Sequence, residues 1–242
     1  MAKKAGKMSL LLLLVMVCIY LFLHSSVFNI SKVYVSGQKK VTSDEVKALA
    51  GVTPGENLFK IDGDLIEKSV EIHPVVKNAQ MIRHLPRSVE IKIEERVSWA
   101  VVPYEDLFLL IDDEGHCLDK LNKLPDGNTP IITMEQMPAR VNLGQAVNPE
   151  VIKMIKTVWK SIDAEGRAQI SQFHYANTQK SLLIYTLEGT EVRYGNLERV
   201  EEKAANFTEA LKIEASLQKE GKDQLEYVDL RFSGRPVVKT KT

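Results

Sequence analysis

The sequence predicts an α+β protein with three parts: a single N-terminal transmembrane helix, a βααββ domain, and a mixed α/β domain that ends in C-terminal strands. A long apolar run near the N-terminus predicts the first part, and capped helices between alternating strands predict the second. Turn residues between further strands and helices predict the third. The expected boundaries are 1–7 for a cytoplasmic tail, 8–28 for the transmembrane helix, 29–97 for the first domain, 98–238 for the second, and 239–242 for a polar tail.

The apolar run extends from Met8 to Phe28, and its central part, Leu10 to Leu23, carries no charge. As a helix the 21 positions would be roughly 31 Å long, close to the hydrocarbon thickness of a bilayer. Three lysines, at positions 3, 4 and 7, precede the run. Short lysine-rich flanks stay in the cytoplasm, so we expect a single-pass type II protein whose C-terminal part is extracytoplasmic.

Two other interpretations of this segment fit its residues less well. A cleaved signal peptide needs two small residues at the −3 and −1 positions of a cleavage site, and pairs such as Leu23 with Ser25 do not supply them. A lipoprotein needs small residues before the lipidated cysteine, whereas Met16 and Val17 precede Cys18. We therefore expect an uncleaved membrane anchor.

Charge and cysteine content restrict the function further. The part beyond the anchor holds 29 basic and 32 acidic residues, so it has no basic field for nucleic acid. Cys18 lies in the predicted membrane helix and Cys117 lies outside it, so the two cannot pair within one chain. The extracytoplasmic part must therefore be stabilised by packing rather than by disulfides.

The first domain shows clear helix boundaries. Thr42 and Glu45 have the spacing of a capping box, Gly51 is placed as a left-handed stop, and Asp62 can cap a second helix. Alternating residues predict the strands around these helices. The expected strands are Ile30 to Gly37, Val75 to Arg83, and Ser88 to Glu94.

Several short segments of this domain, in this order and directly after one membrane helix, carry a family resemblance. They are Val33–Gly37, Gly51–Gly55, Asn57–Phe59, Pro74–Ala79, Arg83–Pro86 and Ile91–Arg96. Together they resemble the POTRA domain of FtsQ/DivIB bacterial cell-division proteins.

The second domain alternates strands and helices. Asn148 and Pro149 begin a helix that we expect to end at Gly166, and a longer helix is expected from Leu197 to Glu220, with Gly221 as its stop. The expected strands are Trp99–Val102, Leu107–Ile111, His116–Leu118, Ile131–Ile132, Ile170–Tyr175, Leu182–Thr186, Glu191–Tyr194 and Leu225–Phe232, with Val237–Val238 after a turn at Ser233–Pro236. The Leu-x-Asp-x-x-Gly hairpin and the segment from Tyr227 to Phe232 resemble the β-domain of the same family.

The chain departs from the family pattern at two places. The tail of seven residues before the anchor is shorter than many relatives carry, and Ser98-Trp99 stands where a proline is common.

No motif indicates catalysis. The histidines at positions 24, 73, 84, 116 and 174 lie in different elements, and no nucleophile motif occurs. Acidic residues, His116 and Cys117 gather near the turn Asp112–Gly115, but a tight hairpin points alternate side chains to opposite faces, which argues against a metal site. We expect no enzyme, no cofactor, no metal and no small-molecule substrate.

Protein binding is the expected function. A C-terminal hairpin tends to leave a sheet edge with unpaired main-chain groups, which can accept a strand from a partner. The resemblance implies a divisome scaffold at the septum that binds FtsB/DivIC-like and FtsL-like division proteins near its C-terminal strands. The candidate residues are Tyr227, Val228, Asp229, Leu230, Arg231 and Phe232.

Three alternatives remain open. Val228, Leu230 and Phe232 could face the core instead of a partner. The POTRA-like block could belong to a secretion chaperone, or the chain could be a membrane-anchored envelope hydrolase.

Overall fold

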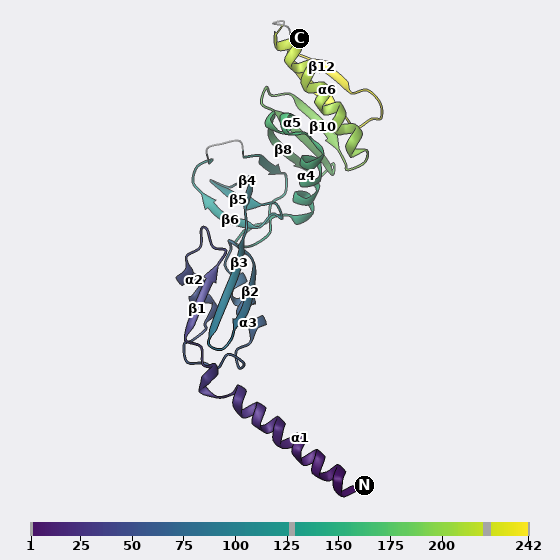
Figure 1. Cartoon of the computed structure of the whole chain (residues 1–242). Helices are drawn as coiled ribbons and strands as arrows, with labels where there is room; N and C mark the ends of the chain where they lie inside the picture. The colour runs from purple at the N-terminus through teal and green to yellow at the C-terminus, as the bar shows by residue number, and fades with distance from the viewer. Residues whose placement is uncertain (1, 126–128, 220–223, 242) are drawn as a thin grey trace. The chain divides into compact units, whose positions relative to one another are not determined.

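The computed structural model describes residues 2–125, 129–219 and 224–241. The chain forms two compact units, Met1–Arg96 and Val97–Thr242, and Figure 1 labels their helices and strands. Each unit is described by itself.

The N-terminal helix α1 (Ala2–Leu23) differs from the predicted span at both ends. It begins before Met8 and stops at Leu23, because the Asn57 side-chain amide donates to the carbonyl oxygens of Leu23 (3.0 Å) and Ser25 (3.3 Å). A short 3-10 turn, η1 (Ser26–Phe28), follows. Phe28 is 7% exposed and lies in the core of the first unit, so it is not part of the apolar helix.

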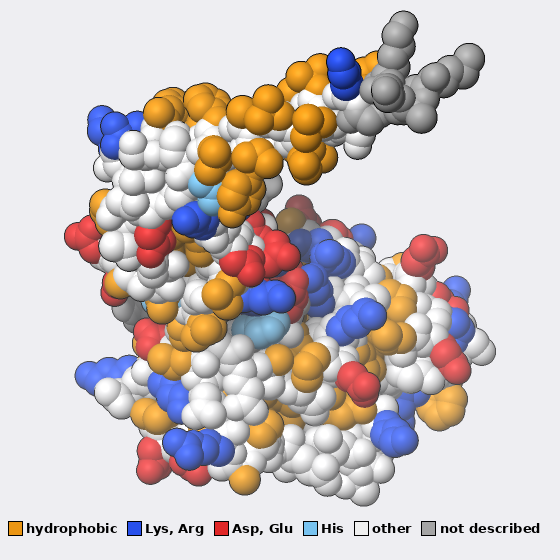
Figure 2. Space-filling model, turned by 90° about the horizontal axis from the view of Figure 1, so that it is seen from below, with side chains coloured by type: hydrophobic (Ala, Val, Ile, Leu, Met, Phe, Trp, Pro, Cys, Tyr) orange, Lys and Arg blue, Asp and Glu red, His pale blue; other side chains and the backbone are white. Residues whose placement is uncertain are grey.

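Most side chains of α1 from Met8 to Phe22 are apolar and exposed, as the space-filling view shows along the helix (Figure 2). Among the described residues, no helix combines the length and the apolar character that crossing a membrane requires.

The rest of the first unit has the predicted βααββ order. Its three-stranded sheet has the order β1-β3-β2, with β1 parallel and β2 antiparallel to the central strand. Both helices pack on one face, where alternate residues of β3 are buried. The elements are β1 (Lys32–Ser36), α2 (Ser43–Ala50), α3 (Gly63–Glu71), β2 (Val76–His84) and β3 (Ser88–Glu95).

Local sequence signals explain the helices of this unit. The Thr42 side chain accepts the Glu45 N–H (3.3 Å) and the Glu45 carboxylate accepts the Thr42 N–H (2.8 Å), which confirms the capping box. Gly51 ends α2 in the left-handed conformation, and Asp62 caps α3. These caps satisfy main-chain groups that a helix end otherwise leaves unpaired.

The second unit is built on one nine-stranded mixed sheet with the order β12-β11-β10-β9-β8-β7-β4-β5-β6. Apolar residues of α4 and α6 form a common core with alternate residues of the central strands. The elements are β4 (Ser98–Tyr104), β5 (Leu107–Asp112), β6 (Cys117–Leu121), β7 (Ile131–Met134), α4 (Pro149–Ser161), α5 (Ala164–Ala168), β8 (Ile170–Ala176), β9 (Ser181–Thr186), β10 (Glu191–Gly195), α6 (Val200–Lys219), β11 (Leu225–Asp229) and β12 (Val237–Thr240).

Two helix boundaries in this unit differ from the prediction. Helix α4 ends at Ser161, and Asp163 caps a separate helix, α5, in which Gly166 is an interior residue rather than a stop. Gly166 is buried there, and an added Cβ would meet the Ile162 side chain at 2.8 Å, so its role is close packing. Helix α6 begins at Val200 rather than Leu197, and the predicted end at Glu220 and Gly221 lies outside the described residues.

Candidate functional site

The six predicted partner-binding residues lie at the end of β11 and just beyond it. Val228, Asp229 and Leu230 are buried, Tyr227 is half-buried, and Arg231 is exposed. The possibility that Val228 and Leu230 face the core is therefore confirmed. For Phe232 it is wrong, since that side chain is 64% exposed.

The predicted edge of the sheet is not at these residues. Strand β11 pairs in parallel with β10 and antiparallel with β12, and it ends at Asp229 instead of Phe232. The edge strand is β12, all four of whose residues are exposed. The β-branched residues Val237, Val238 and Thr240 after the Ser233–Pro236 turn were the signal for an additional strand.

The direction of the main chain in β12 follows from one hydrogen bond beyond its end. The Lys241 N–H donates to the Gln224 carbonyl oxygen at 2.8 Å and so points toward the β11 side. Main-chain groups alternate in direction along a strand of an antiparallel pair. The N–H and C=O groups of Val238 and Thr240 therefore point away from β11, where an incoming strand can pair with them.

Strand β2, at an edge of the other sheet, has carboxylates on its outward N–H groups. The N–H of Ala79 donates to Glu71 Oε1 (3.0 Å), and the N–H of Met81 donates to Glu67 Oε1 (2.8 Å). Both glutamates come from α3. This edge is therefore blocked by charged side chains, a common protection against strand addition.

Strand β6, at the far edge of the nine-stranded sheet, is covered at its start by the chain around Gly144. The Cys117 N–H donates to the Gln145 carbonyl oxygen (2.9 Å), and the Gly144 N–H donates to the Cys117 carbonyl oxygen (2.7 Å). Of the two edges of this sheet, β12 is thus the better placed to accept a partner strand.

The turn between β11 and β12 is held by α6 (Figure 1). Asn206 donates its side-chain amide to the Gly234 carbonyl oxygen (2.9 Å), and the Glu202 carboxylate accepts the Gly234 N–H (2.9 Å). The Arg199 guanidinium donates to the Arg231 carbonyl oxygen (2.8 Å). These bonds fix the hairpin in place, which lowers the entropy that binding would cost.

A Tyr–Arg cluster lies near the edge, on strands β9, β10 and β11. The Arg193 guanidinium lies 3.9 Å from the centre of the Tyr227 ring and donates to Glu191 at 2.8 Å. The Tyr185 hydroxyl donates to the same carboxylate at 3.3 Å. Tyrosine and arginine are enriched at the energetic centres of protein interfaces, so this cluster is suited to contact a partner.

Asp229 and Arg231 form a closely bonded ion pair at the end of β11. Arg231 Nη2 donates to Asp229 Oδ2 at 2.5 Å, and the Arg231 N–H donates to Oδ1 at 3.0 Å. Hydrogen bonding to Arg231 lowers the pKa of the Asp229 carboxyl, although burial opposes this shift. The Asp229 side chain is 7% exposed and that of Arg231 is 43% exposed. The pair therefore compensates a buried charge with a half-exposed one.

We expect Arg231→Ala to lower the free energy of unfolding by about 1–3 kcal/mol at neutral pH, because it leaves the buried Asp229 carboxylate without its charged partner. A carboxyl whose pKa is lowered by folding contributes stability above its unfolded pKa of about 3.9, and loses it as the pH falls through the folded value. Urea unfolding should thus show a difference in the free energy of unfolding between wild type and Arg231→Ala, and this difference should become smaller at acidic pH. Arg235→Ala, a change of an exposed arginine, serves as the control. An equal loss of stability in this variant would contradict a stabilising role of the ion pair between Asp229 and Arg231.

Near the start of β6, three side chains that the sequence analysis expected to point to opposite faces of a hairpin lie together. Asp112, Glu114 and His116 have ligand atoms within 4.8 Å of one another. The expectation that a tight hairpin separates these side chains is wrong, because the Asp112 carboxylate accepts the N–H groups of Glu114 (2.9 Å) and His116 (2.8 Å) and the turn folds around it. Cys117 is buried and Asp113 pairs with Lys156, so these two are not in the group.

Comparison with known proteins identifies both units. The model of the FtsQ-type POTRA domain matches residues 28–96, and the model of the C-terminal part of the cell division protein FtsQ/DivIB matches residues 100–231, more than half of the chain. The chain is 27% identical over 221 residues to cell division protein FtsQ of Geobacter sp. (strain M21), covering 89% of this chain and 77% of that protein.

Relatives in other bacteria match similarly. FtsQ of Corynebacterium glutamicum is 27% identical over 188 residues, covering 78% of this chain and 81% of that protein. Cell division protein DivIB of Clostridium tetani is 23% identical over 234 residues, covering 94% of this chain and 85% of that protein. With both units matched in order, the chain belongs to the FtsQ/DivIB family of cell-division proteins.

Proposed function

We propose that this protein is a non-enzymatic scaffold of the divisome that binds other single-pass division proteins through the edge strand β12. The observation that carries the proposal is this exposed edge, with the main-chain groups of Val238 and Thr240 directed outward. Membership of the FtsQ/DivIB family supports a role in division. In this role the chain organises septal cell-wall synthesis by protein contacts and needs no cofactor.

The proposed partners are the FtsB/DivIC-like and FtsL-like proteins that the sequence resemblance implies. An extended segment of the partner would add a strand to β12, so that its main chain supplies affinity. Its side chains would reach the neighbouring Tyr227 and Arg193, which supply specificity. Among the originally predicted residues, Tyr227, Arg231 and Phe232 are accessible to such a partner. Val228, Asp229 and Leu230 would support the strand from within.

We further propose that α1 anchors the chain in the cytoplasmic membrane, with residues 1–7 in the cytoplasm and the chain beyond Phe28 outside. The exposed apolar side chains of α1 support this proposal, because in water they would form a large unfavourable surface. The lysines that precede the apolar run support the orientation. Such an anchor would place the scaffold at the septum beside single-pass partners.

The secretion-chaperone alternative receives no support from the β2 edge of the first unit. A chaperone that captures extended chains by strand addition requires an open sheet edge. At β2 the outward N–H groups of Ala79 and Met81 already donate to glutamates of α3.

Co-purification tests the proposal. The full-length chain, expressed with its own organism's FtsB/DivIC-like protein and extracted in mild detergent, should retain that partner through affinity purification. A chain that ends before Val237 lacks β12 and should lose it. Equal retention by both would move the binding site away from the edge. Turnover of peptidoglycan by the purified chain, abolished by changing one carboxylate, would contradict the non-enzymatic role.

A further inference from the structure

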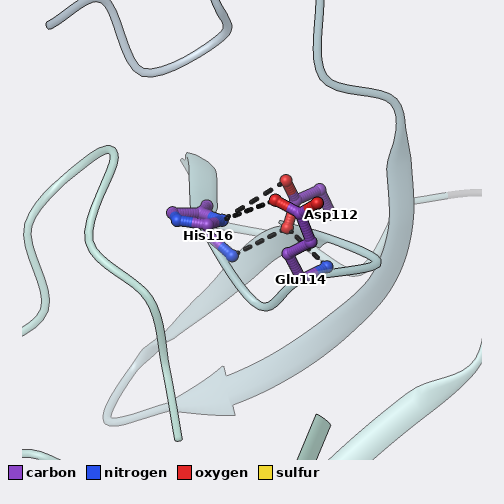
Figure 3. A group of neighbouring side chains, drawn as sticks. All are labelled: Asp112, Glu114 and His116. Carbon is purple, nitrogen blue, oxygen red and sulfur yellow. Dashed lines mark hydrogen bonds and ion pairs between the residues drawn. The ribbon is translucent and has the colours of Figure 1, made fainter. Parts of the chain in front are cut away.

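The hairpin between β5 and β6 brings two carboxylates and an imidazole to one side of a tight turn (Figure 3). Asp112 is the last residue of β5, and Glu114 and His116 follow at intervals of two. His116 Nδ1 lies 3.5 Å from Asp112 Oδ2 and 3.7 Å from Glu114 Oε2. The ligand atoms therefore come from three different side chains that face a common point.

Two features fix the positions of these ligand atoms. The carboxylate of Asp112, which is 2% exposed, accepts the N–H groups of Glu114 (2.9 Å) and His116 (2.8 Å) at Oδ1, so its Oδ2 is turned toward the imidazole. The turn is also bonded to a neighbouring segment, since the Val147 N–H donates to the Gly115 carbonyl oxygen at 2.8 Å. Ligands oriented in this way lose little freedom when an ion binds.

The separations themselves are close to those around a bound metal ion. His116 Nδ1 lies 3.5 Å from one carboxylate and 3.7 Å from the other, within ion-pair distance of both. Ligand atoms about 2.0–2.1 Å from one Zn²⁺ ion at tetrahedral angles are about 3.3–3.4 Å apart. Small movements of the exposed Glu114 side chain would complete this geometry.

We infer that Asp112 Oδ2, Glu114 Oε2 and His116 Nδ1 form a site for a divalent transition-metal ion, with Zn²⁺ as the best fit to mixed imidazole and carboxylate ligands. Three protein ligands leave the fourth position of a tetrahedral ion to water. The bound ion would brace the hairpin by linking the three side chains. This inference is independent of the proposed role of β12.

Calorimetric titration of the purified full-length chain with Zn²⁺ tests the site. Wild type should bind about one equivalent of the ion. Glu114→Gln and His116→Ala should each weaken binding at least about tenfold, because each removes one ligand. Glu114 is suited to this test because its side chain is 41% exposed, so its substitution disturbs the packing little. Circular dichroism verifies that each variant is folded.

Asp113→Asn is the matched control, since it removes a carboxylate from the same turn while leaving the three ligands unchanged. Asp113 instead pairs with Lys156 at 2.5 Å. Zn²⁺ should raise the melting temperature of wild type and of Asp113→Asn, but not that of Glu114→Gln. If wild type does not bind Zn²⁺, the inference is wrong. If all variants bind it equally, the inference is also wrong, and Zn²⁺ binds to other groups of the chain.

Discussion

Replacing Val238 by proline should abolish or strongly weaken capture of the FtsB/DivIC-like partner while leaving the nine-stranded sheet folded. Proline removes an N–H that points away from β11, so the ladder between β11 and β12 keeps its bonds. Loss of one or two intermolecular hydrogen bonds, with the local distortion, should weaken binding about ten- to hundredfold. Binding of the purified full-length chain to surface-immobilised partner would give the dissociation constants of wild type and of Val238→Pro.

The matched control at the same position is Val238→Ala, which truncates the side chain but keeps the main-chain donor. It should bind nearly as tightly as wild type if the main chain supplies the affinity. Equal loss in both variants would assign the interaction to the Val238 side chain instead.

Proline at Asp229 or Arg231, two of the residues predicted to bind a partner, would be a poorer test of strand addition. Asp229, the last residue of β11, pairs with both neighbouring strands, and the Arg231 N–H is bonded to Asp229. Such changes would disturb folding together with binding.

Gly37→Ala should have the largest effect on stability, with a loss of about 2–5 kcal/mol in the free energy of unfolding of the first unit. Gly37 has a φ of +88°, and an added Cβ would lie 2.0 Å from the Ile93 carbonyl oxygen of β3. A left-handed conformation costs an alanine about 1–2 kcal/mol, and relief of the clash by movement of β1 or β3 adds about 1–3 kcal/mol. Urea unfolding followed by circular dichroism would measure the loss.

Gly51→Ala is the control for this change. Gly51 also has a positive φ, +62°, but no atom lies within 4 Å of its added Cβ. Its substitution should therefore cost only the conformational term of about 1–2 kcal/mol. If the two variants were equally stable, the close approach of the chain at Gly37 to β3 would not be a determinant of the stability of this unit.

The first unit was predictable because its signals are local. A capping box at Thr42 and Glu45, a left-handed stop at Gly51 and strict alternation along β3 each depend on a few neighbouring residues. Every local preference agrees with the final packing, so element order could be derived without knowledge of long-range contacts.

The candidate site could be predicted only in part, because strand order depends on pairings between distant residues. Alternation identified the segment Leu225–Phe232 as a strand, but not that β10 and β12 occupy its two sides. The end of α1 likewise depends on the distant Asn57, whose amide caps the helix before Phe28. The grouping of Asp112, Glu114 and His116 could not be predicted from strand alternation, because it depends on a turn in which the Asp112 carboxylate accepts two main-chain N–H groups.

The position of the protein in dividing cells tests the central claim most directly. A fluorescent protein fused to the N-terminus of the full-length chain, expressed at its native level in growing bacteria of the same species, should accumulate at mid-cell as the septum forms. The scaffold function predicts this accumulation because the partners act there. An even distribution around the whole envelope of dividing cells would contradict it.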